Sequence, residues 1–283
     1  CKKVSGSQYL MRNILVLKVD VDTLTGTIKG IPALIELFDK YKIKGTFYVS
    51  LGPDNTGKKI LDVFKKGFLQ KAARTNAVKI YGLKNLMYGF LLPAPQIHKK
   101  ATGQLKLLSD KNFESGVHSY DHVYWHQNLE LLDAAEIRNI LNASSEIYYT
   151  IYNRRPETFA APGWTVSAEY FKVIDSFKLK YLSDTRGYRP FYPVIDNYQS
   201  STLQIPTTLF TLDELLGLKS DDEIIDYYVG EISNNDFNAM TIHTELEGGA
   251  FKNLFEIIIQ KLLSKNIIIT DLKGYYENFL NSS

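Results

Sequence analysis

Residues 13–23, NILVLKVDVDT, decide the fold of this 283-residue chain. The stretch is apolar and rich in β-branched residues, which predicts a buried strand, and it ends in two carboxylates, Asp20 and Asp22. A helical pattern follows at 30–42, and then a second strand-like run at 45–50. A strand, a helix and a strand in this order indicate parallel pairing, with helices burying both faces of the sheet.

The rest of the chain continues the alternation of strands and helices. Further strand-like runs lie at 113–119, 156–163, 180–184, 202–206, 238–243 and 266–272. Helical stretches are expected between most of them, at 133–149, 167–177, 221–233 and 254–264. About eight strands alternating with helices predict one α/β domain, an irregular (β/α) barrel over residues 11–283, with residues 1–10 as an N-terminal arm.

Composition restricts the class of protein. Apolar residues make up 45% of the chain and charged residues 23%, which is normal for a soluble protein with a sizeable core. The single cysteine, Cys1, excludes an internal disulfide bond. The first 13 residues contain no apolar run that could serve as a signal peptide, so we expect an unexported protein.

Polar residues follow several of the strand-like runs. In a barrel the C-terminal ends of the strands meet on one face, where active sites lie. Asp20 and Asp22 point to the same side of an extended strand, and His118 and His243 also follow apolar runs. We therefore expect these side chains to share one pocket.

Two histidines four residues apart suggest a metal site. His118 and His122 lie in GVHSYDHVYWHQ, residues 116–127, where one turn of helix or a tight loop can present both imidazoles. A carboxylate with two imidazoles suits Zn²⁺ or another divalent metal, and the lack of a thiolate favours catalytic over structural use. An Asp-x-Asp motif alone is commonly a loop or a helix cap, and a pair of histidines alone is commonly a surface feature. Both motifs together, at the ends of strands, favour the metal site.

These residues resemble the motifs of the polysaccharide deacetylase family, which is also named for NodB homology. The similar segments are DVD at 20–22, HSYDH at 118–122, APGW at 161–164, SD at 183–184 and TIH at 241–243. The resemblance implies an irregular (β/α)7-type barrel and the hydrolysis of an N-acyl amide on an amino sugar.

The resemblance also implies a role for each residue. The metal, Zn²⁺ first and Mn, Co or Ni as other candidates, would be bound by Asp22, His118 and His122. Asp20 would be the general base that takes a proton from water whose pKa the metal has lowered. His243 would protonate the departing amine, and Asp184 would orient His243 and raise its pKa.

The oxyanion would be held by a backbone N–H near Gly163 or Trp164. One departure concerns the third motif, which in the family usually carries an arginine that touches the base. Ala160 stands at that position here, and Arg186 in SDTRG is the candidate replacement. A surface or phosphate-contacting role is an equal alternative for Arg186.

A cationic segment stands apart from an otherwise acidic chain. Residues 58–100 contain nine lysines and one arginine against one acid, among long apolar residues at helical spacing. This predicts an amphipathic insertion that associates with an anionic membrane surface, with the alternative of an amphipathic lid packed on the barrel. Nucleic acid is the rival partner, and the apolar residues argue against it.

A narrower resemblance concerns the branch of the family that deacylates amino sugars on undecaprenyl phosphate for lipid A modification. It is carried by KVDVDTLTGTIKG, GTFYVSLGPDN, SDTRG and TIHTELEG. It implies a lipid-linked substrate, substrate contacts at Asp54, Asn55 and Glu245, and a peripheral enzyme on the cytoplasmic face of the inner membrane. For GPDN, residues 52–55, a turn is the plainer interpretation.

The expected reaction is removal of an acetyl group from the lipid-linked amino sugar, with formyl a close second. Alternatives are an allantoinase-like amidohydrolase acting on a soluble substrate and a catalytically inert carbohydrate-binding protein. Intact Asp20 and His243 argue against the inert reading. No feature of the sequence indicates an obligate protein partner.

Overall fold

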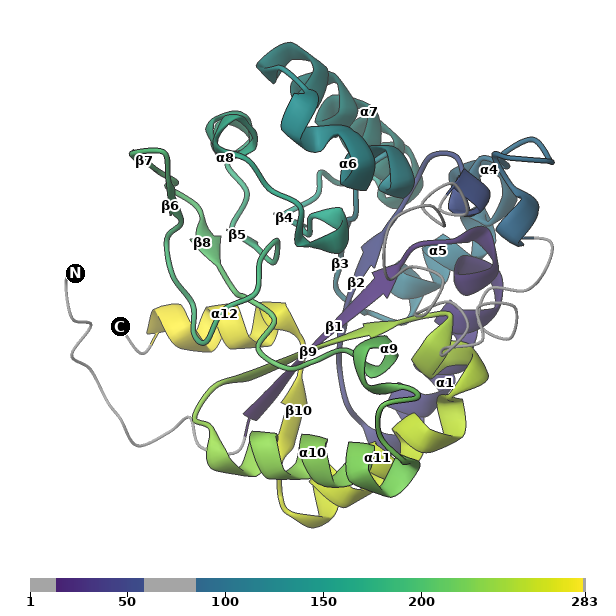
Figure 1. Ribbon diagram of the computed structural model, residues 1–283, viewed down its shortest axis with the longest axis vertical. Helices are drawn as coiled ribbons and strands as arrows, with labels where there is room; N and C mark the ends of the chain where they lie inside the picture. Colours follow the sequence, from purple (N-terminus) through teal and green to yellow (C-terminus); the bar gives the residue numbers. More distant parts are fainter. Residues whose placement is uncertain (1–13, 59–84, 282–283) are drawn as a thin grey trace.

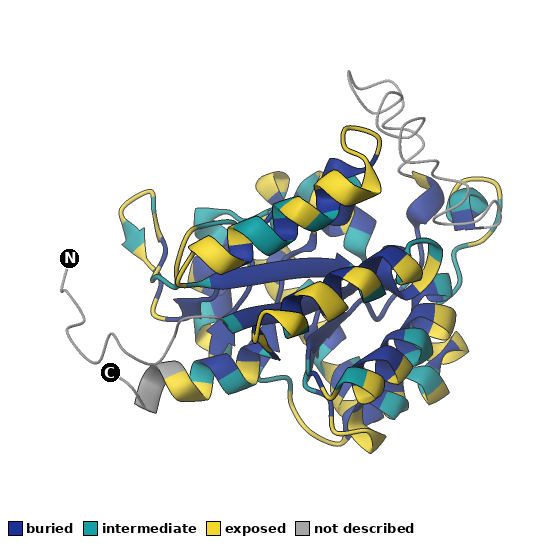
Figure 2. Cartoon of the chain, turned by 90° about the horizontal axis from the view of Figure 1, so that it is seen from below, coloured by how far each residue is buried: buried dark blue, intermediate teal, exposed yellow. Residues whose placement is uncertain are grey.

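The computed structural model describes residues 14–58 and 85–281, and it shows a curved parallel sheet surrounded by helices (Figure 1). The helices present exposed residues outward and buried residues toward the sheet (Figure 2). The strands of the sheet are β1 (Ile14–Val21), β2 (Thr46–Val49), β3 (Ser115–Val117), β4 (Thr158–Phe159), β5 (Tyr181–Leu182), β8 (Leu203–Gln204), β9 (Asn238–His243) and β10 (Ile268–Thr270).

β1 is the strand to which the rest of the sheet is attached. β9 pairs with it in parallel from Leu15 to Asp20, while β2 pairs with its C-terminal half and β10 with its N-terminal half. Every residue of β1 after Ile14 is buried. The apolar sequence of this strand follows from that burial, and Lys18 and Asp20 are the two ionisable exceptions within it.

The sheet continues from β2 through β3, β4 and β5 to β8, all by parallel pairing. Within the described residues no strand ladder joins β8 to β9. The backbone N–H groups of Thr208 and Leu209 instead donate to the carbonyl of Ala239, at 3.0 and 3.3 Å. The prediction of an irregular (β/α) barrel is therefore confirmed, and the irregular part is the closure between β8 and β9.

The helices expected from periodicity are present. Two of them begin at residues that satisfy their first N–H groups: Asp133 and Ser220 each form a reciprocal capping box with a glutamate three residues on. The α-helices are α1 (Ile31–Tyr41), α4 (Ile97–Lys100), α5 (Thr102–Asp110), α6 (His122–Asn128), α7 (Ala134–Tyr152), α8 (Ala168–Ile174), α9 (Leu212–Leu215), α10 (Asp221–Asn234), α11 (Lys252–Ser264) and α12 (Leu272–Asn281).

Several short elements were not expected from the sequence. They are a hairpin of β6 (Val194–Ile195) and β7 (Tyr198–Gln199), the 3₁₀ turns η3 (Asn85–Met87), η4 (Leu129–Leu131), η5 (Pro162–Trp164) and η6 (Asp175–Phe177), and the π-helical turns η1 (Gly26–Gly30) and η7 (Leu246–Ala250). The two π-helical turns follow β1 and β9 and pack closely. A Cβ atom at Gly30 would lie 2.3 Å from the carbonyl oxygen of Thr244, so only glycine fits there.

Two predicted segments fall wholly or largely outside the described residues. The N-terminal arm, 1–10, lies outside, and so does most of the cationic segment, 58–100, of which 58 and 85–100 are described. Membrane association of that segment stays a prediction. Within residues 14–58 and 85–281, no helix has the length and apolar character needed to cross a bilayer.

Gly116 gives a direct test of the packing between β2, β3 and β4. A Cβ atom there would lie 2.7 Å from side-chain atoms of both Tyr48 and Thr158, and 2.8 Å from the backbone oxygen of Thr158. Because the backbone cannot move away freely, we expect Gly116→Ala to lower the free energy of unfolding by roughly 1–3 kcal/mol in urea denaturation. Gly103→Ala in α5, where the added atom meets nothing within 4 Å, is the matched control and should not destabilise the protein. Equal stabilities would contradict the packing described.

Candidate active site

The C-terminal ends of β1, β3 and β9 bring the predicted residues together. Asp20 lies on β1 directly opposite His243 in the parallel register with β9. Asp22 follows the end of β1, and His118 follows β3 by one residue. Asp20 and His243 therefore meet because β1 and β9 are parallel neighbours, and His118 joins them from β3, which is separated from β1 by β2.

Asp22, His118 and His122 have the spacing of ligands around one ion. The Nε2 atom of His118 lies 3.3 Å from Oδ1 of Asp22, and Nε2 of His122 lies 3.4 Å from its Oδ2. One ligand atom from each of the three residues lies within 4.8 Å of the others. Two ligands about 2.1 Å from a tetrahedral zinc ion are about 3.4 Å apart, so the arrangement matches a single metal ion.

The hydrogen bonding of the trio also fits a cation. Nδ1 of His118 lies 2.7 Å from the carbonyl oxygen of Ala160, which fixes the ring and leaves Nε2 for a ligand. Nε2 of His118 and Oδ1 of Asp22 are buried and have no hydrogen-bond partner within the described residues. Such atoms require an explanation, and a divalent ion between them supplies one.

The two histidines come from different elements. His118 lies in the loop after β3, while His122 is the first residue of α6. Asp121 caps that helix by accepting from the N–H groups of Val123 and Tyr124, at 3.1 and 3.0 Å. The carboxylate between the two histidines therefore builds the loop and turns His122 toward Asp22.

The imidazoles determine the ionisation of Asp22. Burial disfavours the charged carboxylate, but His122 and His118 outweigh this and hold the pKa of Asp22 well below its usual value. An anionic carboxylate beside two imidazoles is the form that a cation requires.

Lys18 is a site residue that sequence reasoning missed. Its side chain is 3% exposed, and its Nζ lies 3.3 Å from Oδ2 of Asp20 and donates to the carbonyl of Ser183 at 3.1 Å. The signal was present in the sequence, since 18, 20 and 22 share one side of an extended strand. Lys18 is therefore the cation that accompanies Asp20.

The structure corrects the expectation for Arg186 as the cation beside the base. Its guanidinium pairs with Glu214 at 2.6 Å and lies over the Trp164 ring, 4.1 Å from the centroid. The described structure gives it no bond to Asp20, because the loop after β5 carries it to α9 rather than into the barrel.

Asp184 also lies in an unexpected environment. Its carboxylate accepts from the N–H of Ala161 at 2.8 Å, the hydroxyl of Tyr170 at 2.8 Å and Nε2 of Gln204 at 2.9 Å. Burial raises its pKa to about 6, although these hydrogen bonds act in the opposite direction. The structure gives no bond from Asp184 to His243, so Asp184 ties β4, α8 and β8 together instead of orienting that histidine.

Other carboxylates act on His243. Burial lowers the pKa of this histidine, but Asp22, Asp213 and Asp20, followed by Glu247, raise it above its usual value. Glu247, in η7, accepts the backbone N–H of His243 at 2.8 Å and is itself fully buried. Sequence reasoning missed Asp213 and Glu247, because neither lies at the end of a strand.

The predicted substrate contacts Asp54 and Asn55 make bonds within the protein. Asp54 accepts from the N–H of Leu24 at 2.8 Å and from the N–H and hydroxyl of Thr56, at 3.1 and 2.6 Å. Asn55 donates to Asp121 at 2.5 Å. These contacts correspond to the turn interpretation, and they hold the loops around the trio.

Glu245 is also internal. Its Oε1 accepts from the N–H and the hydroxyl of Thr23, at 3.0 and 2.5 Å, and it fills the space that a side chain at Gly26 would take. Burial raises its pKa to about 7, and Asp22 acts in the same direction. The carboxyl group clamps the loop after β1 to the loop after β9.

Gly163 and Trp164 form the turn after β4. Both have positive φ, 59° and 54°. The N–H of Trp164 donates to the carbonyl of Ala161 at 3.2 Å, so Gly163 is the better placed of the two for an oxyanion. A Cβ atom at Gly163 would lie 2.2 Å from the ring of His126, which packs directly over this glycine.

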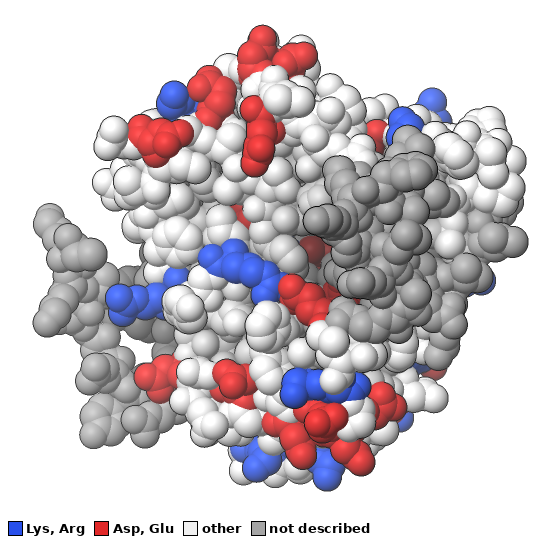
Figure 3. Space-filling view, in the orientation of Figure 1, with Lys and Arg blue, Asp and Glu red and all other residues white. Residues whose placement is uncertain are grey.

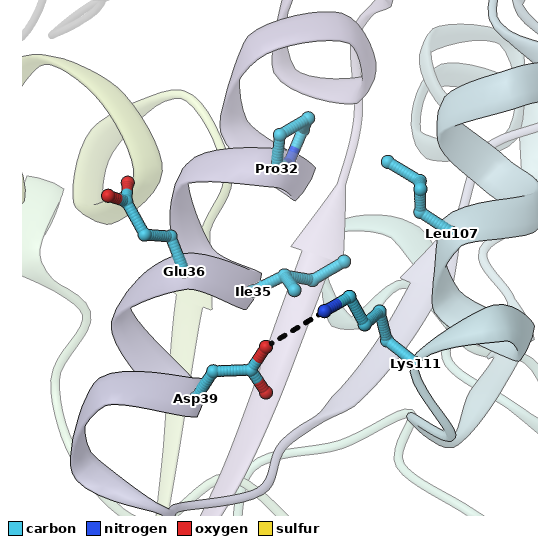
Figure 4. Close-up of a pocket in the computed structure, with 6 residues that line it drawn as sticks. All are labelled: Pro32, Ile35, Glu36, Asp39, Leu107 and Lys111. Carbon is cyan, nitrogen blue, oxygen red and sulfur yellow. Dashed lines mark hydrogen bonds and ion pairs between the residues drawn. The ribbon is translucent and has the colours of Figure 1, made fainter.

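The surface of the molecule has a hollow on one face and a separate groove between two helices. Figure 3 shows one face of the molecule, where acidic and basic groups adjoin near the middle beside a hollow with acidic atoms deep inside it. A groove of about 370 Å³ lies between α1 and α5, bordered by the Asp39–Lys111 ion pair at 3.4 Å (Figure 4). It contains none of the predicted site residues, so we assign it no part in the chemistry.

Known proteins agree with this arrangement. The model of the family described as polysaccharide deacetylase matches residues 20–182. A protein of Shewanella sediminis named as a probable 4-deoxy-4-formamido-L-arabinose-phosphoundecaprenol deformylase, ArnD, is 33% identical over 255 residues, covering 89% of this chain and 82% of that protein.

Solved structures show the same fold at low sequence identity. PuuE allantoinase has a TM-score of 0.64 at 12% identity, covering 97% of this chain and 93% of that one. The Bc1960 peptidoglycan N-acetylglucosamine deacetylase has a TM-score of 0.58 at 14% identity, covering 95% of this chain and 89% of that one. Taken with the family match and the relative, the chain belongs to the polysaccharide deacetylase family, on the branch of the formamido-arabinose-phosphoundecaprenol deformylases.

Proposed function

We propose that this protein hydrolyses the N-acyl amide of an amino sugar linked to undecaprenyl phosphate, with a divalent metal as cofactor. The observation that supports the proposal most directly is the spacing of Asp22, His118 and His122, at 3.3 and 3.4 Å, beside a second aspartate and a histidine. Family membership makes the chain a hydrolase of the deacetylase and deformylase type, and the name of its Shewanella relative supports the lipid-linked substrate.

Asp22, His118 and His122 would hold the metal. A divalent ion in such a site supplies Lewis acidity, which polarises the amide carbonyl and lowers the pKa of water toward ~7. Zn²⁺ suits two imidazoles and one carboxylate, and Mn, Co and Ni are the other candidates. The trio leaves room for substrate because, within the described residues, no fourth protein ligand joins it.

Asp20 would be the general base. It lies next to the trio, with its Oδ2 3.8 Å from Nε2 of His118, and its Oδ1 has no hydrogen-bond partner within the described residues. Lys18 pairs with Oδ2 and fixes the direction of the carboxylate, so the other oxygen can take a proton from the attacking water.

His243 would be the general acid. The amine of a cleaved amide is a poor leaving group unless it is protonated as the C–N bond breaks. Asp213, Asp20 and Glu247, which lie outside the metal trio, each act to raise the pKa of His243, and this favours the protonated imidazole needed for this step. The backbone N–H of Gly163 would stabilise the oxyanion.

The acyl group and the cellular role are finer proposals. The sequence alone put acetyl ahead of formyl, whereas the name of the Shewanella relative supports formyl. We therefore propose the formamido sugar as the first substrate to test and the acetamido sugar as the second. A role in lipid A modification at the cytoplasmic face of the inner membrane follows from the same reasoning.

Two other functions compete with this one. An allantoinase-like enzyme would act on a soluble substrate, and the likeness to PuuE allantoinase concerns the fold. An inert carbohydrate-binding protein would not need a buried Lys18–Asp20 pair beside a metal trio. Turnover of lipid-linked and soluble substrates separates all three.

The first prediction tests the reaction. Purified protein incubated with undecaprenyl-phosphate-linked N-formyl and N-acetyl amino sugars should release one acyl group, which mass spectrometry identifies by the mass lost. Asp20→Asn should reduce turnover by roughly 100-fold or more and retain the metal, because it removes the base and leaves the trio intact.

Asp39→Asn, in the groove between α1 and α5, is the matched control and should keep full turnover. Turnover of ureides or free N-acyl sugars alone would favour the soluble-substrate alternative. A fully active Asp20→Asn enzyme would refute the assignment of the base.

The second prediction concerns Lys18. Lys18→Met leaves Asp20 buried without its cation, and breaking a buried pair in this way costs about 3–5 kcal/mol of unfolding free energy. We expect kcat to fall at least roughly tenfold, since the base loses its partner. Lys18→Arg keeps the charge and should recover most of kcat; steady-state kinetics with metal analysis checks both. Wild-type kcat in the methionine variant would show that Asp20 acts without Lys18.

The third prediction concerns the cationic segment, 58–100. If it associates with anionic lipid, replacing Lys65, Lys66 and Lys71 by glutamine should weaken binding to phosphatidylglycerol vesicles by roughly 100-fold, at about 1 kcal/mol for each lysine. Vesicle flotation measures this.

The matched control replaces three other lysines, Lys261, Lys265 and Lys273, and should bind as the wild type does. Equal binding by all three proteins would remove the membrane role from this segment.

A further inference from the structure

Arg186 is held rigidly but has no partner in the reaction described so far. Its side chain is 34% exposed and lies over Trp164, with the guanidinium 4.1 Å from the ring centroid and 5.9 Å from that of Phe210. One of its nitrogens donates to Glu214 at 2.6 Å, and another donates to the carbonyl of Leu209 at 3.4 Å. An arginine fixed in this way is ready to bind a ligand with little loss of side-chain entropy.

The partner that fixes Arg186 is itself fixed. Glu214 accepts from the N–H of Thr211 at 2.8 Å and from its hydroxyl at 3.0 Å, as part of the capping box of α9. A guanidinium has five N–H donors, and two have partners in the described part of the chain. The remaining donors can bind a further oxyanion in the plane of the group.

Trp164 connects Arg186 to the reacting centre. The same indole that carries Arg186 lies 5.9 Å from Nζ of Lys18, which in turn lies 3.3 Å from Asp20. Arg186 is therefore one aromatic ring removed from Lys18, and Lys18 contacts the base. In a sugar that carries an N-acyl group on one carbon and a phosphate on another, the phosphate is likewise one ring away from the amide.

We propose that Arg186 is the anchor for the phosphate that links the amino sugar to its lipid. This inference rests on the proposed function and adds the part of the substrate that the metal trio does not recognise. Lys18 already accompanies Asp20, so Arg186 is not needed at the base, and the N–H donors that Glu214 and Leu209 leave over can serve the substrate. Planar, partly buried arginine is the side chain that binds phosphate oxygens in pairs.

The test compares two substrates and two variants. One substrate is the undecaprenyl-phosphate-linked N-acyl amino sugar, and the other is the same N-acyl amino sugar without phosphate. For Arg186→Gln, the ratio of kcat/KM on the first substrate to kcat/KM on the second should fall by roughly 10- to 100-fold, mainly through KM. Arg186→Lys keeps the charge but loses the planar group of N–H donors, so its ratio should lie between that of the wild type and that of Arg186→Gln.

Arg189→Gln is the matched control, because it removes an exposed positive charge from the same loop and should leave the ratio unchanged. An Arg186→Gln enzyme impaired equally on both substrates would show a structural role and overturn the inference. So would a wild type that prefers the phosphate-free sugar, although amide hydrolysis would then still stand. A wild type inactive on both substrates would refute the proposed function together with this inference.

Discussion

The structure depends on one constraint, which is that β1 and the residue that follows it place three ionisable side chains, Lys18, Asp20 and Asp22, in the interior of a barrel. A buried charge is costly unless a partner compensates it. Lys18 and Asp20 compensate each other at 3.3 Å, and His118 and His122 approach Asp22. The two aspartates therefore have different surroundings. Asp20 has an ammonium group beside it, and Asp22 has two imidazoles.

Much of the fold could be predicted from the sequence, because the pattern of buried strands and amphipathic helices is local. β9 was expected at the residues where it is found, and polar residues at strand ends pointed to the correct meeting place of Asp20, Asp22, His118 and His243. The parts that were missed depend on contacts distant in sequence. The closure through Ala239 and the packing of η1 on η7 leave no periodic signal.

Only part of the site could be predicted, for a similar reason. A motif identifies residue types at a spacing, but it does not say which neighbour a side chain reaches. Asp184 has the expected position after β5, yet Ala161, Tyr170 and Gln204 occupy its oxygens. Arg186 has the right charge, but its loop leads to α9. Lys18 belongs to the first strand, but its role could not be predicted from burial patterns, because lysine is rarely buried in a strand.

The carbonyl oxygen of Ala160, which holds the ring of His118, belongs to the main chain and is present whatever side chain stands at that position. The orientation of the imidazole therefore does not depend on which side chain stands at residue 160. A lineage could exchange a large charged side chain for a methyl group there without loosening the histidine, provided that a positive charge was supplied from another strand.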